Sequence, residues 1–455
     1  MAASDAHRRL RSWWRGPEKK GNRGEVVAMG RTVILAAIAA AAAWWALGGA
    51  GALRAEEDVG VTVGCMFPMT GRGSLYGKDS VAAIRIAVDE VNARGGAAGR
   101  FIRVLFEDSK SKPAYAVRIA QRYIAEDHVD FLCGVVSSGV GLAVSAVARE
   151  NRTIFIGTDH ASSRLTIENF HPYYFRVSNN TYQSMAAGAL YLAELQAQTQ
   201  WKTIAFVGPD YEYGHIMWDD LRTRLDALGV EYSVVGEFWP KLYEPDFTPY
   251  IAAVLRNAPE ILVDGHWGGD AVAFIRQAKG YGLFEKVKFF NFDAGGNYEV
   301  MATLGNDMPL GLVLSARHHN NWPKTELNRK FVEKFRAVTG RYPSYAAEGA
   351  YAGIVAIAAA VNRVGNAEDT EALIRAFESL RLKLPEDPEG FTSYMDPDTH
   401  QIVQAQAIGE VVPNTDFPPA TTMLGNWRIY EADLLVPTLE EVRQRRLRAR
   451  TAPTN

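Results

Sequence analysis

Cysteine is almost absent from this sequence, whose 455 residues include only Cys65 and Cys133. Two cysteines cannot build the disulfide framework of a small secreted domain, and no cysteine–histidine grouping has zinc-site spacing. Each cysteine lies four residues before a loop residue, on strands that could be neighbours, so a bridge is conceivable. Two buried free thiols are the favoured interpretation.

Signature motifs of common enzymes are also missing. There is no Walker sequence and no G-x-S-x-G elbow, and the glycine-rich residues 71–77 depart from G-x-G-x-x-G in their last gap. His318 and His319 are adjacent, so on a strand they would point to opposite faces, and a surface loop is expected instead of a metal site. We therefore expect no enzyme activity, no metal and no other cofactor.

The first 55 residues differ from the rest of the chain. A leader with several arginines and lysines precedes an apolar run at residues 32–53, and small residues then lead to an acidic start at residues 56–58. This order predicts a secretory signal peptide over residues 1–55, cut after Ala55 or alternatively after Ala52. The run is also long enough for a membrane anchor. Met29 is an alternative start of the signal.

Positive charge is scarce once this leader is removed. Residues 1–55 hold nine of the 49 Lys and Arg and three of the 52 Asp and Glu, which leaves 40 basic and 49 acidic residues, net −9. An acidic exported protein is a poor candidate for nucleic-acid binding.

Apolar runs alternate with helix-like patterns along the remaining chain. Strands are expected in two series, at residues 61–67, 101–107, 131–136 and 153–158, and then at 203–207, 232–238, 261–263 and 287–292. Three helices are expected at 325–338, 346–364 and 371–382, and a hairpin within 391–411. Alternation of this kind predicts an α/β fold with mostly parallel sheets. The basic residues 443–450 are interpreted as a solvated helix face or a frayed end.

The segment 131–139 best shows how a site could form. Its apolar run leads into Ser137, Ser138 and Gly139 and then into a helical pattern. A helix amino terminus after a buried strand presents free N–H groups that suit a carboxylate. The alternative is that Ser137 only caps the helix.

Ligands of open α/β sheets bind beyond the carboxyl ends of the strands. The residues expected there are hydroxyl-bearing, aromatic or acidic. Serines and helix amides suit a carboxylate, Asp293 suits an amine, and aromatic rings cover apolar groups. This chemistry indicates a small polar or zwitterionic ligand.

Several segments in this order also resemble a known family. They are residues 61–77 with 89–96, 134–138, 163–166 before 174–176, 210–214 and 275–278. Together they resemble the type I periplasmic solute-binding proteins of ABC importers, specifically the leucine/isoleucine/valine-binding family, over roughly residues 59–435.

The resemblance implies two α/β lobes that close on a ligand and are joined by three crossovers, near Val177, Leu314 and Phe391. Lobe I would comprise residues 56–177 and 315–391, and lobe II residues 178–314 and 392–435. A basic tail, residues 436–455, would follow.

The same resemblance implies ligand roles. Ser137 corresponds to the serine that takes the ligand's carboxylate, and Asp293 to an amine-binding glutamate. Ala161 stands where amino-acid receptors have a threonine, with Ser162 next to it, and Trp267 stands where they have a tyrosine. The predicted ligand-binding residues are Tyr76, Ser137, Ser138, Asp159, Ala161, Ser162, Tyr213, Trp267 and Asp293.

The function implied is that of a periplasmic substrate-binding component, monomeric as is usual in the family. It would capture a branched-chain or other amino acid and deliver it to ABC permease subunits that work with cytoplasmic ATPase subunits. Two alternatives stay open at this point. One is an exported ligand sensor that signals to a membrane protein, and the other is a receptor for amides, urea or aromatic carboxylates.

Overall fold

Strand β1 (Val61–Phe67) shows why the strands of this protein form where they do. All seven of its residues are buried, and a continuous apolar run is typical of a parallel strand covered on both faces. In the computed structural model, which describes residues 60–451, β1 lies between two parallel neighbours. The predicted signal peptide and its cut sites lie outside the described residues.

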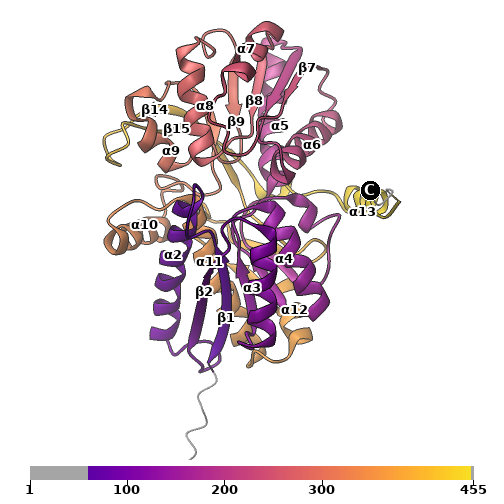
Figure 1. The fold of residues 1–455 in the computed structure, drawn as a ribbon, viewed down its shortest axis with the longest axis vertical. Coiled ribbons are helices and arrows are strands. Elements are labelled where there is room, and N and C mark those ends of the chain that lie inside the picture. Colours follow the sequence, from indigo (N-terminus) through magenta and orange to yellow (C-terminus); the bar gives the residue numbers. More distant parts are fainter. Residues whose placement is uncertain (1–59, 452–455) are drawn as a thin grey trace, which may run out of the picture. The chain divides into compact units, whose positions relative to one another are not determined.

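Two sheets organise the described chain (Figure 1), and each sheet with its covering helices is called a lobe. The sheet of lobe I has the order β11-β12-β13-β5-β4-β3-β1-β2. Strands β2 to β5 and β13 run parallel to their neighbours toward β1, whereas β11 and β12 are antiparallel. The bounds are β2 (Ile102–Asp108), β3 (Phe131–Gly134), β4 (Ile154–Gly157), β5 (Tyr174–Arg176), β11 (Arg381–Leu382), β12 (Ser393–Asp396) and β13 (Gln401–Val403).

The sheet of lobe II has the order β15-β14-β10-β9-β8-β6-β7. Strands β6 to β10 are parallel, and β14 and β15 add an antiparallel edge. The bounds are β6 (Thr203–Val207), β7 (Ser233–Phe238), β8 (Ile261–Asp264), β9 (Lys288–Asn291), β10 (Val313–Ser315), β14 (Gln406–Pro413) and β15 (Thr422–Tyr430). The expected α/β fold with mostly parallel sheets is confirmed.

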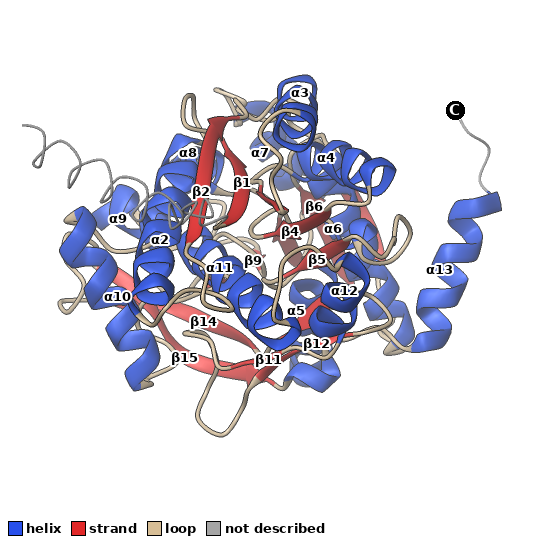
Figure 2. Cartoon of the chain, turned by 90° about the horizontal axis from the view of Figure 1, so that it is seen from below, coloured by secondary structure: helices blue, strands red, loops and turns tan. Residues whose placement is uncertain are grey.

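Helices lie on both sides of the strands (Figure 2). Those of lobe I are α2 (Ser74–Ala93), α3 (Pro113–Ala125), α4 (Ser138–Asn151), α10 (Glu326–Thr339), α11 (Tyr345–Val364) and α12 (Thr370–Glu378). Those of lobe II are α5 (Thr181–Thr199), α6 (Glu212–Ala227), α7 (Thr248–Asn257), α8 (Gly268–Gly280) and α9 (Tyr298–Leu304). The short 3-10 helices among residues 60–451 are η1 (Ser163–Leu165), η2 (Gly305–Asp307) and η3 (Ala432–Leu434). None of the helices within residues 60–451 has the length and apolarity needed to span a membrane.

The chain passes between the two sheets three times, after β5, after β10 and after β13. The third passage was expected near Phe391, but it falls after Val403. The reason is that β12 and β13 pair as a hairpin, and β13 then pairs with β5 through Gln401 and Arg176. This pairing keeps residues 393–403 in lobe I.

Helix α11 packs closely against the sheet of lobe I because it is rich in small residues. At Gly349 an added Cβ would lie 2.0 Å from the carbonyl oxygen of Thr158, the residue directly after β4. No side chain fits in that space, so only glycine allows this approach. The contact holds the first turn of α11, with Tyr345, near the carboxyl ends of the lobe I strands.

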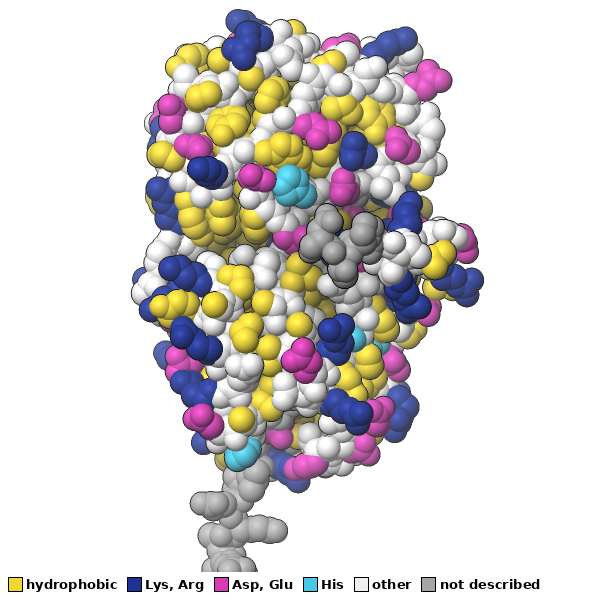
Figure 3. All heavy atoms as spheres, turned by 45° about the vertical axis from the view of Figure 1, so that its right-hand side comes forward, with side chains coloured by type: hydrophobic (Ala, Val, Ile, Leu, Met, Phe, Trp, Pro, Cys, Tyr) yellow, Lys and Arg dark blue, Asp and Glu magenta, His cyan; other side chains and the backbone are white. Residues whose placement is uncertain are grey.

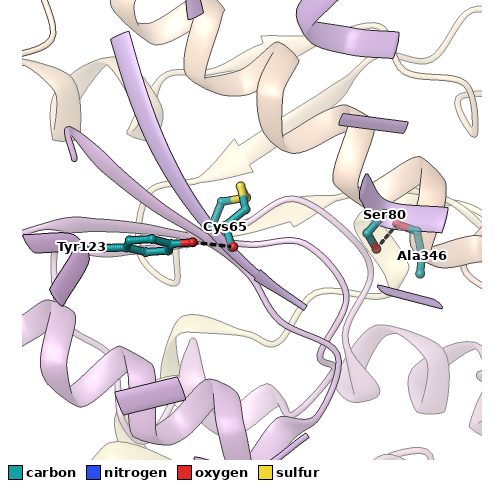
Figure 4. Close-up of a disulfide and its surroundings, with 5 residues drawn as sticks. Cys65, Ser80, Tyr123 and Ala346 are labelled. Carbon is teal, nitrogen blue, oxygen red and sulfur yellow. Dashed lines mark hydrogen bonds between the residues drawn. A yellow bond between two sulfur atoms is a disulfide. The ribbon is translucent and has the colours of Figure 1, made fainter. Parts of the chain in front are cut away.

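The two cysteines form a disulfide, so the favoured interpretation of free thiols was wrong. Strands β1 and β3 are neighbours, and their parallel register places Cys65 opposite Cys133. Both residues are buried, and the hydroxyl of Tyr123 donates to the carbonyl oxygen of Cys65 at 3.3 Å (Figure 4). An apolar pattern predicts burial of a cysteine but not which residue faces it across the sheet.

The basic tail also differs from its interpretation. Residues Leu439–Thr451 form helix α13, and Arg445 on it is buried, with 6% of its surface exposed. Its guanidinium donates to Asp220 and Glu168 at 2.8 and 2.7 Å. The charge run is therefore not simply a solvated face, because acidic partners distant in sequence compensate the buried charge.

Candidate functional site

The loops at the carboxyl ends of the strands bring most predicted ligand residues to the interface between the lobes. Lobe I contributes Tyr76, the serine pair after β3 and the segment after β4, and lobe II contributes Tyr213, Trp267 and Asp293. The Tyr76 and Trp267 ring centroids lie 5.5 Å apart. Every predicted residue is buried except Ser137, which is partly exposed.

Arg317 is the principal residue of this interface that the sequence did not indicate. It follows β10, which places its guanidinium between the lobes. Its Nη1 donates to the backbone oxygen and to Oδ1 of Asp159 in lobe I, at 2.5 and 3.0 Å. Its guanidinium carbon also lies 4.8 Å from the centroid of the Tyr345 ring. Arg317 thereby ties the end of β10 to two elements of lobe I.

Asp293 is fully engaged by protein donors. Its Oδ1 accepts from Arg317 Nε at 3.1 Å and from Ser184 Oγ at 2.6 Å. Its Oδ2 accepts from Arg317 Nη2 at 2.5 Å and from the Tyr213 hydroxyl at 2.6 Å. A carboxylate offers about four acceptor positions, so these donors occupy all of them. Burial acts to raise the pKa of Asp293, but Arg317 and the hydroxyl donors hold it below its usual value.

Asp159, on the opposite side of Arg317, behaves differently. Burial raises its pKa to about 6, although the positive charges of Arg317 and Arg176 act to lower it. The two carboxyls therefore have pKa values shifted in opposite directions on either side of one guanidinium, because Asp293 has many more hydrogen-bond donors.

Tyr76 also contacts lobe II directly. Its hydroxyl donates to Glu299 Oε1 on α9 at 2.5 Å, and burial raises the pKa of Glu299 to about 7. Gly268, with φ +53°, permits this approach, because a Cβ there would lie 2.8 Å from the Tyr76 hydroxyl. Glu299 Oε2 and both amide atoms of Asn297, at the start of α9, are buried without a hydrogen-bond partner among the described residues. Buried polar atoms of this kind are suited to a ligand or water.

The two serines after β3 have different hydrogen bonds. Ser137 occupies the N-cap position of α4, but its side chain accepts no capping bond, contrary to the alternative that it acts only as a cap. Ser138 Oγ instead accepts from the backbone N–H groups of Ala161 and Ser162 at 3.3 and 3.2 Å. Ser138 therefore joins the loops after β3 and β4, while the Ser137 hydroxyl stays available beside the helix terminus.

Ala161 and Ser162 both make contacts with lobe II. The carbonyl oxygen of Ala161 accepts from the backbone N–H of Thr181 at 2.8 Å. Ser162 Oγ donates to Glu212 on α6 at 2.6 Å. Ser162 is thus placed at the predicted interface, with its hydroxyl committed to a protein partner in this arrangement.

The neighbouring histidines differ from the expected surface loop. His318 and His319 are 4% and 5% exposed, and burial lowers their pKa values to about 4 and about 3. His318 contacts Asn328 at 2.8 Å, because α10 packs over the segment. Within residues 60–451 there is no group of three histidine, cysteine or acidic residues arranged to hold a metal ion.

Comparison with known proteins gives one family and many relatives. The model of the family described as "Periplasmic binding protein" matches residues 60–416. Leu/Ile/Val-binding protein homolog 2 of Brucella abortus is 25% identical over 314 residues, which cover 68% of this chain and 80% of the relative. The relatives are named as binding proteins and not as enzymes.

Two solved structures share the fold. The solute-binding protein of an ABC transporter from Rhodopseudomonas palustris BisB5, in complex with 3,4-dihydroxybenzoic acid, superposes with a TM-score of 0.72 at 24% identity and covers 82% of this chain and 97% of its own. A solute-binding protein from R. palustris in complex with benzoate gives 0.70 at 20% identity, covering 82% and 98%.

Proposed function

We propose a solute for this chain, which belongs to the periplasmic binding protein family and is a solute-binding protein of the ABC-transporter type. The proposed solute is a small aromatic carboxylate. The solute binds between the lobes, with its carboxylate near Ser137 and the amino terminus of α4. The rings of Tyr76, Trp267 and Tyr345 enclose its apolar part.

The observation that carries this proposal is the saturation of Asp293 by Arg317, Ser184 and Tyr213. An amino-acid receptor needs an acidic group free to accept the ligand's ammonium. Here the ammonium would have to displace Arg317 from a buried ion pair, which is costly. A solute without an amine avoids this cost. Two structural neighbours bound to aromatic acids are consistent with this class.

An amino acid is the second candidate. The relative from Brucella abortus is named for leucine, isoleucine and valine, and Asp293 stays a predicted amine partner on that reading. Arg317 would then have to turn away when the amine arrives. The two candidates differ in which residue of the Arg317–Asp293 pair the ligand engages.

The proposed function also includes export to the periplasm. The signal peptide over residues 1–55 would be cleaved, and residues 56–455 would work as a monomer in the periplasm, delivering the solute to permease subunits. Mass spectrometry of protein secreted into the periplasm identifies the cut after Ala55 or Ala52, and light scattering gives the oligomeric state.

Thermal unfolding against a ligand panel tests the solute class. Benzoate, 4-hydroxybenzoate and 3,4-dihydroxybenzoate are compared with leucine, isoleucine, valine, small amides and urea. A ligand at 100 times its dissociation constant stabilises the fold by about 2.7 kcal/mol, which gives a clear shift in melting temperature. Shifts with the benzoates alone support the proposal, and shifts with the amino acids alone reject it in favour of the second candidate.

Variants locate the solute within the site. Ser137→Ala should weaken benzoate binding, because it removes a donor to the carboxylate. Ser145→Ala is the matched control, since Ser145 lies on the same helix. Its hydroxyl contacts His171 Nε2, also in lobe I, at a distance of 2.7 Å. Equal affinities for the two variants would exclude Ser137 from the site.

A further inference from the structure

Helix α13 lies beyond residue 416, where the match to the family ends. It runs beside the junction of the two lobes in Figure 1 and stands at the margin of the molecule in Figure 2. Figure 3 turns this side forward and shows Lys and Arg side chains mixed with Asp and Glu side chains over this face.

Arg445 contacts both lobes at once. Its Nε donates to Glu168 Oε1 at 2.7 Å and its Nη2 to Ser163 Oγ at 3.1 Å, both in lobe I. Its Nη1 donates to Asp220 Oδ1 at 2.8 Å, on α6 of lobe II. One buried guanidinium therefore bridges carboxylates of opposite lobes.

Two further residues of α13, Glu441 and Arg446, each contact one lobe. The Tyr182 hydroxyl on α5 of lobe II donates to Glu441 at 2.6 Å. Arg446 donates to the backbone oxygens of Ile167 and Asp398 in lobe I, at 3.0 and 2.7 Å, and covers the ring of Phe170. The helix therefore forms a hydrogen bond with lobe II near its start and hydrogen bonds with lobe I about one turn later.

We propose that α13 is a clasp that stabilises the closed arrangement of the two lobes, with Arg445 as its central residue. A contact made only in the closed arrangement shifts the open–closed equilibrium toward closure, whatever the solute. The clasp would therefore raise solute affinity without touching the solute. This rests on two-lobed closure but not on the identity of the solute.

The distance between the lobes in the absence of solute tests the clasp directly. Spin labels at Lys78→Cys on α2 and Lys241→Cys in the loop after β7 give an interlobe distance, and both lysines are exposed on opposite lobes. The full chain is expressed and exported. Arg445→Ala should broaden the distribution of distances between the two labels and shift it to longer values. Arg443→Ala, which removes an exposed charge from the same helix, should leave it unchanged.

Solute affinity gives a second readout. With 4-hydroxybenzoate as the probe, Arg445→Ala should weaken binding by roughly 5- to 150-fold, the usual range of coupling between conformational states, and Arg443→Ala should not. Because Arg445→Ala could impair folding, Glu441→Gln, which loosens only the grip on lobe II, is measured in parallel and should shift the distance in the same direction.

Folded variants with wild-type interlobe distances would overturn the clasp, whatever their affinity for the probe. Longer distances in Arg445→Ala, together with no binding of any benzoate by the wild type, would leave the clasp standing and reject the proposed solute. The two failures are therefore distinguishable.

Discussion

The guanidinium of Arg317 donates to both carboxylate oxygens of Asp293, at 3.1 Å from Nε and 2.5 Å from Nη2, within the interface of the lobes. Both side chains are almost completely buried. Two parallel N–H···O bonds give a fixed orientation as well as attraction. This pair decides what Asp293 can offer a ligand.

Arg317→Met should lower the free energy of unfolding by about 3–5 kcal/mol, because it leaves Asp293 buried without a compensating charge. Urea denaturation measures the change. Arg276→Met is the matched control, since Arg276 pairs with Asp307 at 3.5 Å on the surface, and exposed pairs contribute about 1 kcal/mol or less. Equal losses in the two variants would contradict a buried pair.

Ser137→Ala should leave the free energy of unfolding nearly unchanged, because the Ser137 side chain makes no capping bond. Asp369→Ala, at the start of α12, should lower it by about 1 kcal/mol, because Asp369 accepts from the backbone N–H of Ala372 at 3.0 Å. Chemical denaturation compares the two. A loss at Ser137 as large as that at Asp369 would restore the capping role.

Replacing Cys65 and Cys133 together by alanine should lower the free energy of unfolding by about 2–5 kcal/mol. The bridge closes a loop across a sequence separation of 68 residues, and its loss frees the unfolded chain. Denaturation with and without reductant measures this. The reductant should destabilise the wild type but not the double variant, and a wild type insensitive to full reduction would argue against the bridge.

Glu299 should make stability depend on pH. Burial raises its pKa from 4.5 to about 7, so the folded state binds the proton more tightly than the unfolded state does. The contribution is therefore most favourable below pH 4.5 and is lost as pH rises to about 7, by an amount on the order of a few kcal/mol. Relative to Glu299→Gln, the wild type should lose stability over this range. A constant difference between the two proteins would show an ordinary pKa.

Local pattern was enough to predict much of the chain. The predicted strand at residues 61–67 coincides with β1, and that at 203–207 with β6, since a buried strand requires a continuous apolar run whatever its neighbours are. The polar residues after the strands could also be placed at one edge of each sheet, because parallel strands end on the same side.

The tertiary structure alone decided which residues meet. Arg317 and Asp159 lie 158 residues apart, and no periodicity marks an arginine as the partner of a distant aspartate. The same holds for Cys65 with Cys133, which the register of β1 and β3 brings together, and for Arg445 with Asp220, 225 residues apart. Burial and periodicity are properties of a local segment, whereas the choice of partner depends on how distant segments pack.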